Sequence, residues 1–226
     1  IIFIIKLFKF ILMNKFFMLV VFLFIATDCN NTATEKGKDD KQTKTSEEWL
    51  CIPKQQVGKI TATSTEADLK KLYGEKNVVR DSISVGEGEY ITGTTIFPKS
   101  PNALAIAWKK GREFEEIARI IVKEKSTKWA TDKGITVGSS LQEVVKQNGR
   151  DFSFMGFEWD YYGTVASWED GVFEKKGFGV RFNYEADISK MNMEEVGKVL
   201  GNHEVSTNEP ILKQLDVQVE QMFFFF

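Results

Sequence analysis

Two segments of this chain, 75 residues apart, carry the same pattern. Residues 59–74 read KITATSTEADLKKLYG, and residues 134–149 read GITVGSSLQEVVKQNG. They align without a gap, and their identical pairs are Ile60 with Ile135, Thr61 with Thr136, Ser64 with Ser139, Lys71 with Lys146, and Gly74 with Gly149. An internal repeat constrains the fold strongly, because each copy is expected to form the same local unit.

Each copy predicts a short capped helix. Residues 65–68 (TEAD) begin a capping pattern, and residues 140–143 (SLQE) form a fuller capping box, in which a hydroxyl accepts a backbone N–H and a carboxylate reaches back. Gly74 and Gly149 suit the left-handed residue that ends many helices. We therefore expect an extended approach, a helix and a glycine stop in both copies.

The segments that follow each helix predict antiparallel strands, because their apolar residues alternate or form short runs. We expect strands at 78–85, 91–97, 103–108 and 117–129 after the first helix. After the second we expect strands at 151–162 and 163–168, a hairpin across Lys176-Gly177, a short helix at 191–201, and a last strand at 211–222. We predict no function for the final FFFF segment, residues 223–226.

These elements predict an α+β fold. Two tandem helix-then-antiparallel-strand repeats, at 48–131 and 132–226, are expected to form a curved antiparallel sheet with short helices packed on one face. The second copy resembles the repeat of β-lactamase inhibitory protein and of the small envelope lipoproteins that share its fold. The residues that carry this resemblance are Gly138, Ser139, Ser140, Leu141, Val144 and Gly149.

That resemblance implies a partner-binding sheet face with exposed aromatic residues. The candidates are the exposed members among Tyr90, Tyr161, Tyr162 and Trp168. The whole chain also resembles uncharacterised exported lipoproteins of Bacteroidetes-type bacteria, which implies no activity.

The N-terminal segment predicts export. Lys15 precedes an apolar run at 16–26, which has the length of a signal-peptide core and is too short for a bilayer span of about 20 residues. We expect a signal peptide at 1–28, with Met13 as the more natural start. The alternative is an uncleaved anchor that uses residues 1–26.

Cys29 follows the apolar run and resembles the acylated cysteine of a bacterial lipoprotein signal. The polar segment 29–47 is expected to be a disordered tether. If Cys29 is acylated, it attaches the chain to a membrane and leaves Cys51 as a lone thiol. If it is not, the two cysteines could form a disulfide in an oxidising compartment.

Composition and motif content exclude several functional classes. The chain has 30 basic and 32 acidic residues, so a generic nucleic-acid surface is not expected. His203 is the only histidine, and there is no C-x-x-C, so neither a zinc site nor another cofactor is predicted. The GEGE loop around Glu87 and Glu89 is expected to be solvated rather than to bind calcium.

Aromatic and acidic residues are densest at 148–171, NGRDFSFMGFEWDYYGTVASWEDG. On a strand, Glu158 and Asp160 would share one face and could act as paired glycosidase carboxylates, or simply face solvent. A β-bulge at Met155-Gly156 would make residues 152–162 one strand and bring five aromatics onto its other face. These five are Phe152, Phe154, Phe157, Trp159 and Tyr161.

The sequence therefore favours an exported binding protein at the cell envelope, with an envelope protein or a glycan as partner and no recognisable catalytic set. One alternative is a glycan hydrolase that uses Glu158 and Asp160, with Glu169 and Asp170 nearby. The other is a purely structural lipoprotein.

Overall fold

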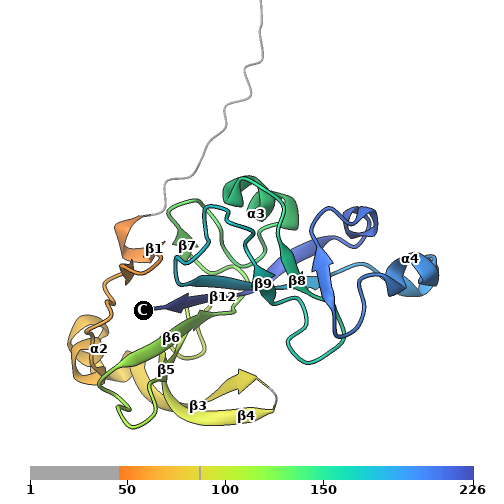
Figure 1. Cartoon of the computed structure of the whole chain (residues 1–226). Helices are drawn as coiled ribbons and strands as arrows, with labels where there is room; N and C mark the ends of the chain where they lie inside the picture. The colour runs from red at the N-terminus through yellow and green to blue at the C-terminus, as the bar shows by residue number, and fades with distance from the viewer. Residues whose placement is uncertain (1–45, 87) are drawn as a thin grey trace, which may run out of the picture. The chain divides into compact units, whose positions relative to one another are not determined.

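The computed structural model describes residues 46–86 and 88–226 (Figure 1). The predictions for the signal peptide, for Cys29 and for nearly all of the tether lie outside this part of the chain. Within it, no helix is both long enough and apolar enough to cross a bilayer.

The two predicted helices and their caps are confirmed. Helix α2 spans Glu66–Tyr73 and helix α3 spans Leu141–Asn148. The Thr65 hydroxyl accepts the backbone N–H of Asp68, and the Ser140 hydroxyl accepts that of Glu143, each at 3.2 Å. Because a capping box depends only on neighbouring residues, the sequence could specify both helix starts.

The two helices end differently. Gly149 is left-handed, with φ 82° and ψ −1°, as predicted. Gly74 has φ 86° but ψ 141°, so this residue leaves the helix in an extended direction and leads into a short 3₁₀ turn, Glu75–Asn77. The third helix, α4, is shorter than expected and spans Met193–Gly197.

Within the described residues the strands form three sheets, and the α+β class is confirmed. All strand pairs are antiparallel except β1 with β7. The first sheet has the order β2 (Gln56–Val57), β1 (Leu50–Ile52), β7 (Ala130–Thr131), and the second has the order β11 (Glu204–Ser206), β8 (Ser153–Met155), β9 (Val165–Ser167). The six-stranded sheet has the order β10 (Phe178–Tyr184), β12 (Val217–Phe225), β6 (Ile117–Val122), β5 (Leu104–Trp108), β4 (Glu89–Ile96), β3 (Val78–Gly86).

Four strand predictions differ from the structure, and one of them, the strand at 151–162, is reduced to β8, which ends at Met155. Strand β6 ends at Val122 rather than near Trp129. Residues 171–177 form turns, so there is no hairpin across Lys176-Gly177, and β10 pairs with β12 instead. The last strand, β12, begins at Val217 and includes most of the FFFF run. This strand lies between β10 and β6 in the sheet.

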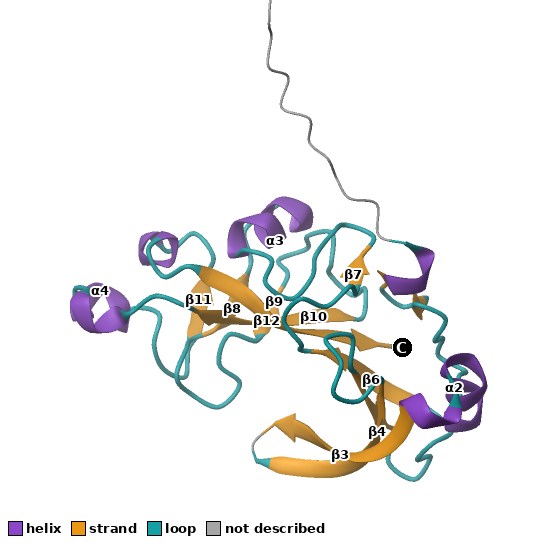
Figure 2. Ribbon diagram, turned by 180° about the vertical axis from the view of Figure 1, so that it is seen from behind, coloured by secondary structure: helices purple, strands orange, loops and turns teal. Residues whose placement is uncertain are grey.

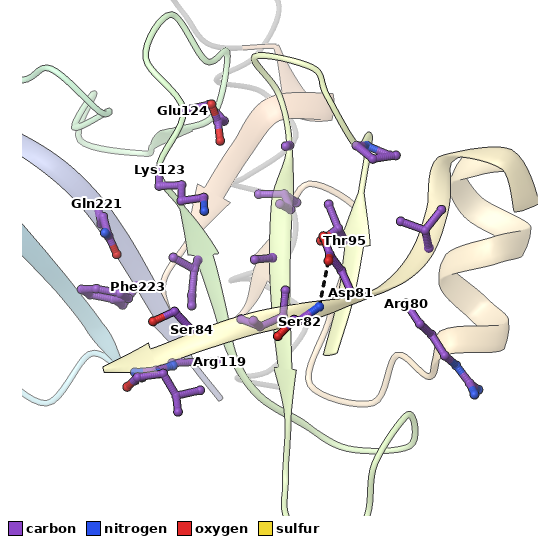
Figure 3. A pocket seen from close by; sticks show the side chains of 18 of the residues that line it. Arg80, Asp81, Ser82, Ser84, Thr95, Arg119, Lys123, Glu124, Gln221 and Phe223 are labelled. Atoms are coloured by element: carbon purple, nitrogen blue, oxygen red, sulfur yellow. Dashed lines mark hydrogen bonds between the residues drawn. The ribbon is translucent and has the colours of Figure 1, made fainter. Parts of the chain in front are cut away.

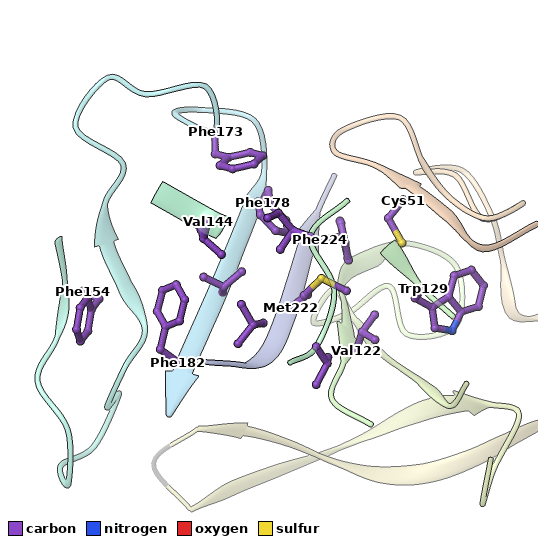
Figure 4. Packing of buried hydrophobic residues seen from close by; sticks show 14 of the residues in the cluster. Cys51, Val122, Trp129, Val144, Phe154, Phe173, Phe178, Phe182, Met222 and Phe224 are labelled. Carbon is purple, nitrogen blue, oxygen red and sulfur yellow. The ribbon is translucent and has the colours of Figure 1, made fainter. Parts of the chain in front are cut away.

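One face of the six-stranded sheet packs against the main hydrophobic core. The core combines helix residues such as Leu69 and Val144 with strand residues from both halves of the chain (Figure 4). Phe178 packs against Phe224 in a tilted arrangement with ring centroids 5.4 Å apart, which joins β10 to β12 inside this core. Truncation of such a fully buried aromatic residue to alanine typically costs about 3–5 kcal/mol.

The opposite face of the same sheet carries a second, smaller apolar cluster. It consists of Ile83, Ile121 and Phe223, with Ile91 and Ala105 packed against them. The two faces follow from the strand period of two: along β6, Ile120 faces the main core, whereas Arg119 and Ile121 face the other way. This second face carries the candidate site.

Candidate functional site

A groove of about 480 Å³ lies over the second face of the six-stranded sheet. Every residue of β3 from Val79 to Gly86 lines it, together with residues of β6, β10 and β12 (Figure 3). Because neighbouring strand residues point to opposite faces, this continuous lining means that the groove follows the edge of β3. Its volume lies within the range of small-molecule and peptide sites.

The groove exists because the sheet curls. In a flat sheet, β3 would lie roughly 14 Å from β6, three strand spacings away. Instead, the Arg119 guanidinium on β6 donates a hydrogen bond of 2.9 Å to the Val85 carbonyl near the end of β3. The long β3–β4 hairpin must therefore bend back over the sheet (Figure 2).

Gly93 of β4 permits this bend. Strand β5 pairs with only residues 94–96 of β4, so the remainder of the hairpin lacks this neighbour. A Cβ at Gly93 would lie 2.5 Å from the Ile106 carbonyl oxygen and 2.5 Å from the Ile83 side chain. A side chain there would force these groups apart, since glycine in a strand often marks such a close approach.

Positive charge dominates the groove. Five basic residues and two acidic ones line it: Arg80, Lys99, Arg119, Lys123 and Arg181, with Asp81 and Glu124. Arg80 is already paired with the Glu66 carboxylate at 3.0 Å, so the groove keeps four basic residues against two acidic ones. This balance is opposite in sign to that of the whole chain, whose net charge is −2. The groove is therefore a local cationic site on an acidic protein.

Arg119 and Arg181 approach each other at one end of the groove. Their guanidinium carbons lie 5.8 and 6.0 Å from the centroid of the same Phe223 ring. Burial, and then the charge of Arg181, lower the pKa of Arg119 from its ordinary value. Within residues 46–86 and 88–226, neither arginine has a carboxylate within 4.0 Å.

Arg181 is held in place by neutral and aromatic groups. Its Nε donates to the Thr164 hydroxyl at 3.3 Å, and its guanidinium carbon lies 5.0 Å from the Tyr162 ring centroid. The Tyr162 hydroxyl in turn donates to Glu220 at 3.0 Å. Burial, and then this hydrogen bond to Glu220, raise the pKa of Tyr162. The arginine pair is thus positioned by packing rather than by direct charge neutralisation.

The four predicted aromatic binding residues do not form one surface. Tyr90 is 67% exposed and Tyr161 is 49% exposed, whereas Tyr162 is half-buried against Arg181. Trp168 is only 7% exposed and donates its indole N–H to the Phe178 carbonyl, so it belongs to the core and not to the exposed set. Tyr162 contacts a groove arginine, because the guanidinium carbon of Arg181 lies 5.0 Å from its ring centroid.

The proposed bulged strand at 152–162 is wrong. Strand β8 ends at Met155, and residues 158–163 form turns. Gly156 packs so tightly that a Cβ there would lie 2.4 Å from the Gly201 carbonyl oxygen. The Phe157 N–H donates to the Val199 carbonyl, which draws the chain out of strand β8.

This turn separates the five aromatics. Phe152, Phe154 and Phe157 are buried in the main core as expected, but Trp159 is 55% exposed and Tyr161 lies on the surface with it. Local alternation could not indicate this outcome, because the contact that ends the strand comes from a segment more than forty residues away.

The acidic candidates lie on exposed turns. Glu158 and Asp160 are exposed and do not share a strand face, so the geometry that motivated paired carboxylates is absent here. Glu158 instead accepts a hydrogen bond from the Tyr184 hydroxyl. Burial, followed by this bond, raises the pKa of Tyr184 to about 12. Glu169 and Asp170 occupy a tight turn with φ values of 52° and 57°.

Cys51 and His203 are the remaining residues that the sequence singled out. Cys51 is fully buried, and burial raises the pKa of its thiol. His203 is exposed, and its ring Nε2 lies 3.0 Å from the Lys198 carbonyl oxygen. Over the described part of the chain, no three His, Cys, Asp or Glu residues are grouped as metal ligands.

Sequence reasoning missed Arg119 and Arg181. The available signal is an arginine within an otherwise apolar strand pattern, IARIIV and FGVRFNY. Comparisons of the chain with protein-family models, with curated proteins and with solved structures give no match.

Proposed function

We propose that this protein binds an anionic ligand in the groove between β3 and the arginine pair. The observation that carries this proposal is the placement of Arg119 and Arg181 beside one Phe223 ring, without a carboxylate partner among the described residues. An anion at this ring would neutralise two charges at once, and guanidinium groups bind carboxylates and phosphates in a bidentate manner.

The apolar floor complements the charge. Ile83, Ile121 and Phe223 form a small cluster on the sheet face beneath the groove. A ligand with an apolar part next to its anionic group would cover this cluster, as expected for sites that combine an apolar lining with a few polar anchors. The proposed ligand is therefore anionic and partly apolar.

Methyl NMR of the full chain tests this proposal. Octanoate, glutarate and an acidic peptide are titrated into protein with labelled isoleucine methyl groups. We expect shifts at Ile83 and Ile121 that weaken with salt and disappear in the Arg119→Gln/Arg181→Gln variant. Arg150→Gln is the matched control, because Arg150 is exposed and does not line the groove. If none of the three anions moves these methyl signals, the proposal is wrong.

We further propose that the binding unit is exported and attached to the cell envelope. The support is the signal-like run at 16–26 followed by Cys29 and a polar segment. Mass spectrometry of the mature N-terminus tests this directly: an acylated Cys29 is expected, and an unprocessed N-terminus would contradict it.

The two helix units are proposed to be structural copies. The Thr61 N–H donates to the Ser64 hydroxyl at 3.0 Å, and Thr136 makes the same bond to Ser139 at 3.1 Å. Both turns lead into capped helices of eight residues. This agreement supports a tandem duplication at 48–131 and 132–226. Exchange of residues 59–74 with 134–149 tests the idea: a swapped chain that fails to fold would contradict interchangeable copies.

A further inference from the structure

Strand β3 is the terminal strand of the six-stranded sheet, and its outer edge faces the groove. In an antiparallel pair, alternate residues direct both backbone polar groups toward the partner strand. The Asn77 carbonyl accepts the Phe97 N–H, which sets the phase of the β3–β4 ladder. Residues 80, 82 and 84 therefore direct their backbone N–H and C=O groups away from β4.

A side chain already bonds to this outer edge. The Ser82 N–H donates to the Asp81 carboxylate at 2.8 Å, which thus occupies a position where an added strand would supply its own acceptor. The Val85 carbonyl, which accepts from Arg119 at 2.9 Å, lies at the register shift between Ser84 and Gly86, just beyond the three outward residues. The edge is competent to form such bonds, as unpaired strand edges generally are.

The polar character of the groove favours a peptide over a fatty acid. Beside the apolar floor, Ser82, Ser84, Thr95 and Gln221 line it. The Thr95 hydroxyl donates to Asp81 at 3.2 Å, which adds a polar contact beside β3 (Figure 3). The outer edge of β3 presents backbone donors and acceptors in alternation, so a partner must present the complementary groups at the same spacing. An extended peptide meets this requirement.

We infer that the groove holds an extended acidic peptide, which adds as a strand to the outer edge of β3 and places a carboxylate between Arg119 and Arg181. The inference rests on the proposed function and specifies its ligand. The eight lining residues of β3, 79–86, correspond to roughly 26 Å of strand, the length of about eight peptide residues. The excess of basic lining residues selects an acidic sequence.

The test uses the full chain and fluorescence anisotropy. The probe is a labelled octapeptide of alternating glutamate and valine. One control peptide carries N-methyl groups on alternate amides, which removes strand donors and keeps the charge; another has lysine in place of glutamate. We expect both controls to bind about tenfold more weakly or worse, as expected when backbone pairing or charge complementarity is lost.

Protein variants separate charge from strand pairing. Ser82→Pro removes one outer-edge N–H and leaves the β4 ladder intact, because proline is tolerated on the solvent side of edge strands. We expect it to weaken binding of the glutamate–valine probe several-fold, whereas Arg150→Gln leaves binding unchanged. The Arg181→Gln variant removes one charge and keeps the Arg119–Val85 bond that positions β3, so it should lose several-fold in affinity through charge alone.

The outcomes distinguish the two claims. If the N-methylated peptide and the Ser82→Pro variant bind like their parents, strand addition is wrong and the anion-binding groove stands. If octanoate shifts the Ile83 and Ile121 methyl signals but no peptide binds, the peptide inference is likewise wrong. If octanoate, glutarate and the peptide all fail to bind, the proposed function is wrong as well.

Discussion

The Arg119 guanidinium donates a hydrogen bond of 2.9 Å to the Val85 carbonyl and thereby joins β6 to the far end of β3. No other described hydrogen bond links these two strands, which lie three positions apart in the sheet. The curl of the β3–β4 hairpin, and with it the groove, depends on this bond and on the bend at Gly93.

Substitution of Arg119 with methionine should therefore loosen the hairpin. A single hydrogen bond to a charged donor contributes about 1.5–3 kcal/mol, but relief of the repulsion from Arg181 offsets part of its loss. Global stability should change little, while amide exchange in β3 and β4 near the hairpin end becomes faster. Hydrogen-exchange mass spectrometry measures this, and unchanged exchange at residues 84–90 would contradict it. Arg150→Met provides the control.

The glycine at the bend should resist substitution. Gly93→Ala places a methyl group 2.5 Å from the Ile106 carbonyl oxygen, so we expect a loss of about 1–3 kcal/mol in the free energy of unfolding. Gly197→Ala is the matched control, because no heavy atom lies within 4 Å of its added Cβ and it belongs to helix α4. This second change should stabilise by about 0.5–1 kcal/mol. Urea denaturation compares the two, and equal effects would refute the steric argument.

Loss of either helix cap should cost similar stability. Ser140→Ala and Thr65→Ala each remove the hydroxyl of a capping box, which typically costs about 1 kcal/mol. The two helices are separate elements, so the double variant should show the sum of the two losses. Gln142→Ala, at an exposed position in the first turn of α3, is the control and should be near neutral. Urea unfolding followed by circular dichroism measures each value.

Alkaline pH should reveal the Tyr184–Glu158 bond. Burial and this bond raise the pKa of Tyr184 from 10.0 to about 12, so between these values the folded chain keeps a proton that the unfolded chain has lost. The contribution of Tyr184 to stability is therefore complete below pH 10 and falls as the pH rises toward 12.

Tyrosinate absorbance during a pH titration checks this directly. Tyr184→Phe should remove the ionisation step with the highest pKa, and Glu158→Gln should shift that step to lower pH because the acceptor loses its charge. Tyr90→Phe, at an exposed tyrosine, controls for the loss of one chromophore. A highest step that survives in Tyr184→Phe would show that another tyrosine causes it.

Local features were readable from the sequence. Both capping boxes, the β3–β4 hairpin around GEGE, and the burial of Phe152 and Phe154 follow from residues close together in the chain. Such signals act over a few residues, so pattern and propensity suffice to specify them. The α+β class follows from the same local patterns.

Contacts between distant segments determined the rest of the fold. Strand β8 ends at Met155 because Gly156 and Phe157 bond to His203 and Val199, which no alternation pattern can foresee. Residues 148–171, whose sequence suggested a possible catalytic site, therefore lie partly in the core and partly in exposed turns.

The candidate groove belongs wholly to the tertiary structure. Arg119 and Arg181 lie 62 residues apart in the chain, and they meet only because β12 pairs with β6 on one side and with β10 on the other. The sequence by itself determined helices α2 and α3, their N-terminal caps and strands β3 to β5, because those depend on neighbouring residues. Long-range strand pairing determined which arginines lie beside the Phe223 ring, because the register of a sheet is set by packing of the whole core.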